Sequence, residues 1–148
     1  MSQGPFDPHE QALLTALREV LNVVPRAVEE DLRIASDLST TEYQALVALA
    51  DTHPVGLRLS ELATRTGLSN SRASRLAHSL IWQGQARRRP VFEDGRGLRL
   101  VATARGLERL HHATACHAES VRRHVLERLR VGGFDLDALT RMLRELNP

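Results

Sequence analysis

One helical face in the middle of the chain collects side chains that could contact a nucleic acid. The apolar residues of the predicted helix 70–83 share one side, at about 100° per residue: Ala73, Leu76, Ala77 and Leu80. The opposite side carries small hydroxyls and a long guanidinium: Ser71, Ser74, Arg75 and His78. Arginine can pair bidentately with guanine, and serine or asparagine can reach base edges or phosphates. This face therefore favours binding in a major groove.

A predicted hairpin after this helix adds more guanidinium groups. Its strands are expected at Ala86–Phe92 and Leu98–Ala102, around a glycine-rich tip. Because Arg87–Arg89 are consecutive, at least one must face the core or extend along it, and the others could contact phosphates. Arg96 at the tip could enter a minor groove with Asp94 as its brace. Taken alone, that pair could also be an ordinary exposed turn contact.

The helix and the hairpin together define the predicted DNA-binding residues. Ser69 is included because, as an N-cap, it leaves the first amides of the helix facing an approaching phosphate. The full predicted set is Ser69, Asn70, Ser71, Arg72, Ser74, Arg75, His78, Arg88, Arg89, Asp94 and Arg96.

Other chemistries find less support. The chain has no glycine-rich phosphate loop, no H-E-x-x-H motif, no nucleophile elbow and no convincing Ser/His/Asp set, so we expect neither an enzyme nor a cofactor. His112, Cys116 and Glu119 fall at i, i+4 and i+7, but three groups on one face do not complete a metal site, and none is predicted. A metal-responsive or Cys116-based redox-responsive regulator stays an alternative.

Trp82 is ambiguous from its position near the end of the helix. It could line a pocket for a small aromatic ligand, but packing against the hairpin is the favoured prediction. Phe6 and Tyr43 are most simply core or dimer-contact residues.

Helices must position these residues, and the sequence contains clear signals for where those helices begin and end. Asp7-Pro8 predicts a helix start, Pro25 a kink or a break, and Ser39–Glu42 a capping box. A short helix at 60–66, a turn at 67–69 and the helix at 70–83 form a helix-turn-helix pattern. A long helix is expected from about 103 to 130, and Asp135 should begin a final one.

Charge is unevenly distributed along these elements. Residues 1–54 carry 3 Arg and 9 acids, residues 55–110 carry 11 Arg and 4 acids, and residues 111–148 carry 6 Arg and 5 acids. The basic middle segment, at +7, thus coincides with the helix pair and the hairpin. Such asymmetry is typical of a phosphate-binding module, although a solvated charge run could also produce it.

Composition limits the class of protein. A length of 148 residues suffices for a hydrophobic core without disulfides or metals. The single Cys116 cannot form an internal disulfide, and neither an apolar run of membrane-spanning length nor a signal-peptide layout is visible. We therefore expect a cytoplasmic protein with no membrane partner.

Several segments resemble the MarR family of regulators. Leu38–Leu46 resembles the family's L-T-x-x-[QE]-x-x-x-L helix start, and Leu59–Ala63 a shortened L-T-x-x-E-L-A element. Leu68–Leu76 is similar to its recognition helix. Asp94-Gly95-Arg96 matches the wing D-x-R, and Thr103-Ala104-Arg105-Gly106 matches the T-x-x-G that follows. Gly84-Gln85-Ala86 departs from the usual G-L-V, and Ala102 from the usual Leu.

The resemblance implies a mainly α (α+β) fold, a winged helix-turn-helix whose N- and C-terminal helices form a dimerisation region. The corresponding ranges are 1–37 and 111–148 for dimerisation and 38–110 for the DNA-binding lobe. It further implies a homodimer that binds double-stranded DNA at a pseudo-palindromic operator, a repressor released by a small aromatic effector. A winged-helix module that contacts only proteins is the remaining alternative.

Overall fold

A computed structural model describes residues 5–91 and 97–146. The chain forms two compact units. The central unit spans residues 32–116, and the terminal unit comprises the described residues of 1–31 and 117–148. The first helix, α1 (Pro8–Ser36), and the helix α5 (Ala104–Val121) contribute residues to both units.

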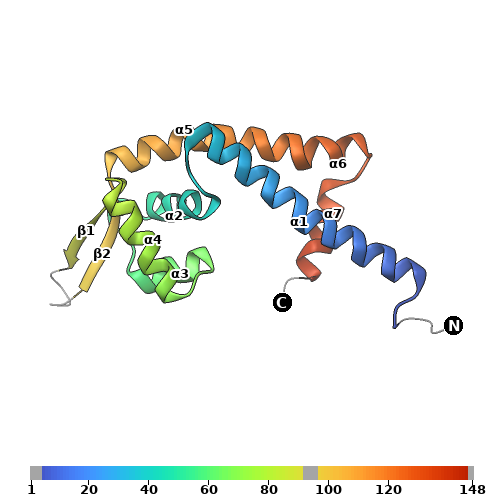
Figure 1. Ribbon diagram of the computed structural model, residues 1–148, viewed down its shortest axis with the longest axis horizontal. Helices are drawn as coiled ribbons and strands as arrows, with labels where there is room; N and C mark the ends of the chain where they lie inside the picture. The colour runs from blue at the N-terminus through green and yellow to red at the C-terminus, as the bar shows by residue number, and fades with distance from the viewer. Residues whose placement is uncertain (1–4, 92–96, 147–148) are drawn as a thin grey trace. The chain divides into compact units, whose positions relative to one another are not determined.

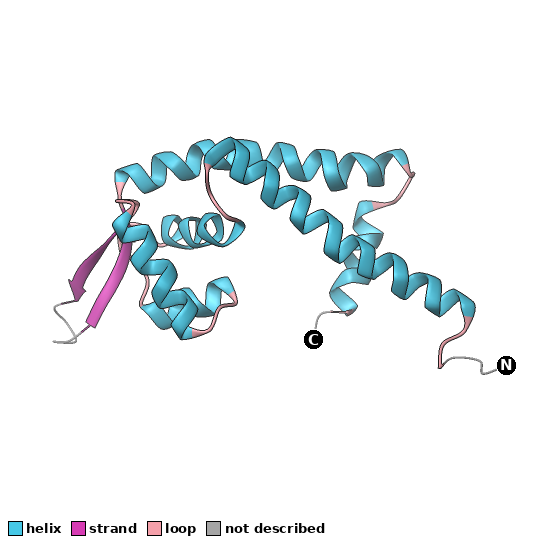
Figure 2. Ribbon diagram, in the orientation of Figure 1, coloured by secondary structure: helices cyan, strands magenta, loops and turns pink. Residues whose placement is uncertain are grey.

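The central unit contains three short helices and a hairpin. In chain order these are α2 (Thr40–Asp51), α3 (Leu59–Thr66), α4 (Asn70–Trp82), β1 (Ala86–Val91) and β2 (Gly97–Ala102). Helix α3 packs on α2 and α4, and the hairpin contacts α2 and α4 (Figure 1). Among the described residues the two antiparallel strands are the entire sheet, and the rest is helix or loop (Figure 2). The mainly helical winged helix-turn-helix fold is confirmed.

A leucine-rich core holds this unit together. Its fully buried leucines are Leu32, Leu38, Leu46, Leu49, Leu62 and Leu80. Each comes from a position where the apolar pattern of a helix or its flank faces inward, and each full burial stabilises the fold by about 1.5–3 kcal/mol. Tyr43 packs against this core, as expected, with its side chain only partly buried.

The predicted helix boundaries are confirmed by their hydrogen bonds. At the start of α2 the Glu42 amide donates to Ser39 Oγ over 3.2 Å, and the Ser39 amide donates to Glu42 Oε2 over 3.0 Å. Helix α3 ends at Gly67 in the left-handed conformation, with φ of 65°. This turn reverses the chain so that Ser69 begins α4.

The T-x-x-G motif joins the hairpin to α5. Thr103 Oγ1 donates to the Gly84 carbonyl over 2.7 Å and accepts from the Gly106 amide over 3.1 Å. A Cβ on Gly106 would meet the Gln85 carbonyl oxygen at less than 3.0 Å. Glycine is therefore needed here because the backbones of α5 and residue 85 approach too closely for a side chain.

The terminal unit contains the rest of the helical chain. Asp7 caps α1 as predicted, accepting from the amides of His9 and Glu10. Pro25 lies inside α1 without ending it. The predicted long helix is present as α5, a π-helical turn (Arg122–Leu126) and α6 (Glu127–Val131), and Asp135 caps α7 (Leu136–Glu145).

A polar cluster links α1 to the end of α5 and to the π-helical turn that follows it. Asp31 Oδ2 accepts hydrogen bonds from Ser120 Oγ at 2.6 Å, His124 Nε2 at 2.8 Å and Arg123 Nη2 at 3.2 Å. The Ser120 hydrogen bond, followed by that of His124, lowers the pKa of Asp31. The carboxylate therefore stays ionised at neutral pH and holds the two helices of this unit together.

Candidate nucleic-acid interface

Helix α4 presents the predicted recognition face outward. Ala73, Ala77 and Leu80 are buried, which orients the helix on the core. On the other side, the side chains at the helix start and along the face are exposed: Ser69, Asn70, Ser71, Arg72, Arg75 and His78. Ser74 lies at the edge and is half-buried. The structure thus brings all seven helix-borne candidates to one end and one face of α4.

The start of α4 is shaped for a close approach. Ser69 Oγ accepts from the Arg72 amide at 3.4 Å and lies 3.2 Å from Ser71 Oγ. Helix α4 carries no acidic residue, so its exposed face is a cationic surface of small hydroxyls and arginines. Small side chains let a helix sit deep in a groove, and arginines attract phosphates.

The three consecutive arginines of β1 have different partners. Arg88 is exposed, and its Nη2 lies 2.6 Å from His78 Nε2 on α4. Arg89 is half-buried and donates to the Val55 carbonyl over 2.8 Å, while Arg87 is exposed. The expectation that at least one of them extends along the core is met by Arg89. Asp94 and Arg96, the predicted tip pair, lie outside the described residues.

Arg99 is a residue that the sequence reasoning missed. Its Nη1 donates to the Gly56 carbonyl over 2.8 Å and lies 3.4 Å from Glu61 Oε2. It stands opposite Arg89 in the hairpin register, and the two guanidiniums bind adjacent carbonyls of the turn before α3. Together they hold the hairpin against that turn. The signal in the sequence was the polar residue between Leu98 and Leu100 in a strand.

A chain of amides connects α2 to the end of α4. Gln85 is fully buried and donates to Gln83, whose own amide donates to Glu42 Oε1 over 3.2 Å. Glu42 is also the acid of the capping box. The departure from the usual G-L-V at residues 84–86 therefore replaces apolar packing with a hydrogen-bonded network. Only the tertiary structure shows this, because the partners are some 40 residues apart.

The predicted packing of Trp82 against the hairpin is wrong. Its side chain is 89% exposed. It lines an open, polar hollow of about 550 Å³ with Asp37, Glu42, Gln83, Arg105 and Arg109. The cause is helical phase: Leu80 takes the buried position at this end of α4, which leaves residue 82 on the solvent side. Phe6 is exposed, so it does not lie in a core, and its dimer contact stays a prediction.

The remaining candidate chemistry is weak in the described part of the chain. No three His, Cys, Asp or Glu side chains come together there as a possible metal site. Cys116 is a free, half-buried thiol, and His112 and Glu119 are exposed. None of the helices among the described residues is long and apolar enough to cross a membrane.

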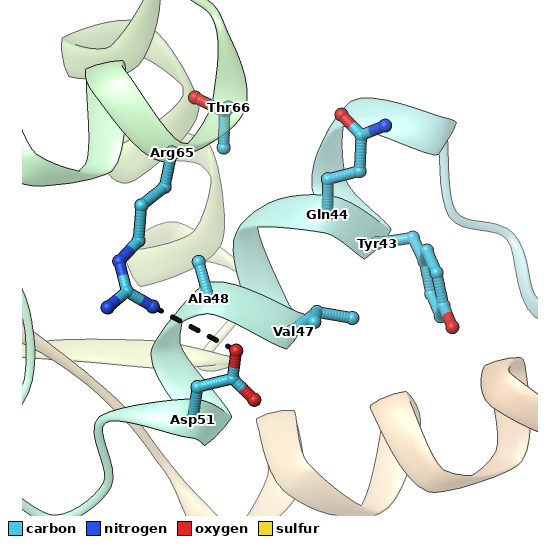
Figure 3. A pocket seen from close by; sticks show the side chains of 7 residues that line it. All are labelled: Tyr43, Gln44, Val47, Ala48, Asp51, Arg65 and Thr66. Carbon is cyan, nitrogen blue, oxygen red and sulfur yellow. Dashed lines mark ion pairs between the residues drawn. The ribbon is translucent and has the colours of Figure 1, made fainter. Parts of the chain in front are cut away.

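A second hollow of the central unit lies between α2 and α3 and has a volume of about 610 Å³. The residues that line it are Tyr43, Gln44, Val47, Ala48, Asp51, Arg65 and Thr66 (Figure 3). Arg65 reaches from α3 towards Asp51 at the end of α2, with 3.9 Å between Nη1 and Oδ2 (Figure 3). The side chains of this ion pair are 45% exposed for Arg65 and 64% for Asp51, so the pair by itself contributes little stability.

Comparison with known proteins supports the resemblance to the MarR family. Residues 36–97 match the model of the MarR family. No curated protein matches the chain in sequence. Among solved structures, AbsC, a MarR family transcriptional regulator from Streptomyces coelicolor, is similar over 99% of this chain and 95% of its own, with 29% identity and a TM-score of 0.85.

Two further structures bear on ligands. Sco3205, a MarR family transcriptional regulator from Streptomyces coelicolor in complex with DNA, is 26% identical over 95% of this chain and 87% of its own, with a TM-score of 0.84. CouR from Rhodococcus jostii, bound to p-coumaroyl-CoA, shares the fold at 22% identity over 90% of this chain and 88% of its own, with a TM-score of 0.73. The family model, the fold and these structures agree in supporting a winged helix-turn-helix transcriptional regulator of the MarR family.

Proposed function

We propose that the protein is a cytoplasmic, sequence-specific DNA-binding regulator that acts as a homodimer on a pseudo-palindromic operator. The observation that carries this proposal is the exposed, acid-free face of α4, with Arg75 at its centre and Arg88 beside it. The complex of Sco3205 with DNA supports it, since that relative shares both the family and the fold. No catalytic role is proposed.

Each predicted contact has a role in this proposal. Ser71, Ser74 and Arg75 would read base edges in the major groove, and Arg88 would contact phosphates. Arg89 would contribute less than predicted, because the Val55 carbonyl already occupies part of its guanidinium. Arg96 would enter the minor groove, braced by Asp94.

The homodimer is supported by apolar surface on the terminal unit. Large apolar side chains that are more than half exposed occur on α1, at the end of α6 and in the segment after it, and on α7 and its C-cap: Leu13, Val20, Leu21, Val23, Val131, Phe134, Met142, Leu143 and Leu146. Exposed apolar surface at this density is typical of a protein–protein interface. A second copy would cover it, and two-fold symmetry would then match two operator half-sites.

The first prediction is salt-dependent binding of duplex DNA by a dimer. We expect sedimentation to show two chains per particle, and anisotropy titrations with DNA fragments from beside its gene to show an affinity that falls steeply with salt. If each protomer neutralises several phosphates, affinity should drop by about 10³-fold or more between roughly 50 and 200 mM salt. A monomer would contradict the dimer, and an absence of salt-sensitive binding would favour a protein-interaction module.

We further propose that the regulator is a repressor and that a small aromatic acid releases it from DNA. The hollow between α2 and α3 supports this, because the phenol ring of Tyr43 and the guanidinium of Arg65 both line it. An aromatic carboxylate would find there both a stacking surface and a charge partner. The structure of CouR with p-coumaroyl-CoA shows that one protein of this fold binds an aromatic acyl ligand.

The second prediction tests this site with p-coumarate and p-coumaroyl-CoA in isothermal titrations. Arg65→Gln should weaken binding about tenfold, the loss of one charge-assisted hydrogen bond. Arg105→Gln is the matched control, because it removes the same charge from an exposed position outside the hollow. Equal losses in both variants, or DNA affinity unchanged by a bound ligand, would contradict the proposed site.

A further inference from the structure

The contact between Arg88 and His78 joins the hairpin to the recognition helix. Arg88 Nη2 on β1 lies 2.6 Å from His78 Nε2 on α4, and both side chains are exposed. Both belong to the predicted DNA-binding set. In this conformation, however, they bind each other, so a DNA phosphate would compete with the contact.

The chemistry of the two groups determines which atom carries the proton. A guanidinium is always charged and has donors only. His78 Nε2 must therefore accept the hydrogen bond, which requires a neutral imidazole with its proton on Nδ1. A protonated imidazole has no lone pair to offer Arg88, and the two cations would repel each other at this distance.

Among the described residues, no carboxylate lines the hollow beside the pair. This hollow is mostly apolar, has a volume of about 270 Å³ and is lined by side chains from α3, α4 and both strands: Leu59, Ser74, Ala77, His78, Arg88, Leu98, Arg99 and Leu100. The charged groups that line this hollow are Arg88 and Arg99, and Arg99 is held by Gly56 and Glu61. On α4 itself the nearest charged neighbour is Arg75, one turn before His78. No carboxylate in this lining stabilises a charged His78.

We propose that His78 is a positioning residue for Arg88 and that it takes up a proton when DNA binds. In the free protein, neutral His78 holds the Arg88 guanidinium at the edge of the recognition helix. On the duplex, phosphate oxygens replace His78 as the acceptor for Arg88. The imidazole then gains a proton at Nε2 from solvent and becomes a second donor to the backbone. This inference rests on the proposed DNA-binding function.

Proton uptake fixes both the direction and the largest possible size of the pH effect on DNA affinity. Proton uptake on binding makes DNA affinity rise as pH falls, across the range of about pH 8 to 5 in which an imidazole changes charge. By linkage, the uptake of one proton changes DNA affinity by at most about tenfold per pH unit. A dimer in which both His78 residues take up a proton changes it by at most about a hundredfold per pH unit. Because the contact is with phosphate, the effect should not depend on base sequence.

The third prediction compares wild type, His78→Gln and His111→Gln. A labelled mixed-sequence duplex of roughly 30 base pairs at low, constant ionic strength serves as the probe, because the phosphate contact needs no operator. Glutamine can accept from Arg88 but cannot titrate, and His111 is an exposed histidine on α5, outside the predicted interface. We expect wild type and His111→Gln to gain at least about tenfold in affinity from pH 8 to pH 6, and His78→Gln to lose most of that gain.

Two further measurements make the test specific. Calorimetry in buffers of different ionisation enthalpy should show about one proton fewer taken up per protomer in His78→Gln. Nitrogen-15 NMR of the free wild type near pH 7.5 should show His78 as the neutral Nδ1–H tautomer. Equal pH slopes in wild type and His78→Gln, or a charged His78 in the free protein, would overturn the inference and leave DNA binding intact. Failure of wild type to bind the duplex at any pH would instead overturn the proposed function, and this inference with it.

Discussion

Replacing Gly56 by alanine is expected to remove about 2–5 kcal/mol of stability, a large part of what a domain of this size has. Two costs add at this position. The residue has φ of 80°, where a Cβ costs about 1–2 kcal/mol. A Cβ would also approach the Leu100 carbonyl oxygen and Val101 Cγ2 to less than 3.0 Å, and overpacking of this kind costs about 1–3 kcal/mol. Urea unfolding followed by circular dichroism would measure the loss.

Gly67→Ala is the matched control for this prediction. Gly67 has a similar φ of 65°, but a Cβ there would meet no atom within 4 Å. It should therefore lose only the conformational cost, about 1–2 kcal/mol. Losses of the same size in both variants would show that the close approach of the turn to β2 is not what constrains Gly56.

Replacing Arg75 by alanine should have the largest effect on DNA binding. Arg75 is exposed at the centre of the recognition face, without an acidic residue on α4 to bind it. A bidentate contact to guanine contributes about 1–3 kcal/mol, and a dimer would lose two such contacts. Operator affinity should thus fall by at least about 30-fold in anisotropy titrations.

Two further variants distinguish the effect of the bidentate geometry of Arg75 from the effect of its charge. Arg75→Lys keeps the charge but cannot form the bidentate pair, so it should retain binding to mixed-sequence DNA and lose preference for the operator. Arg105→Ala removes an exposed arginine of the same unit away from the recognition face and should change affinity little. An equal loss in Arg75→Ala and Arg105→Ala would mean that only net charge matters and that α4 does not read the sequence.

The helix boundaries could be predicted because their causes are local. Ser39 and Glu42 are three residues apart, and Gly67 acts through its own backbone conformation, so short sequence windows contain the whole signal. The same is true of the face of α4. Its period alone separates Ala73, Ala77 and Leu80 from Ser71 and Arg75, and the structure confirms that separation.

The partners of individual polar side chains could not be predicted in this way. Arg88, Arg89 and Arg99 look alike in the sequence, but one contacts a histidine and two hold carbonyls of a turn more than 30 residues away. The exposure of Trp82 is unpredictable for a related reason. Its exposure depends on which residue of the last turn of α4 meets the core, and Leu80 takes that place.

The sequence by itself therefore predicted the family resemblance, the order of the elements and the face of α4 that could contact DNA, because periodicity, caps and motif spacing are local properties of the chain. The tertiary structure alone decided which partner each basic residue contacts. Helix packing and strand register bring distant side chains to within hydrogen-bonding distance, and only there does Arg88 find His78 while Arg99 binds the turn before α3.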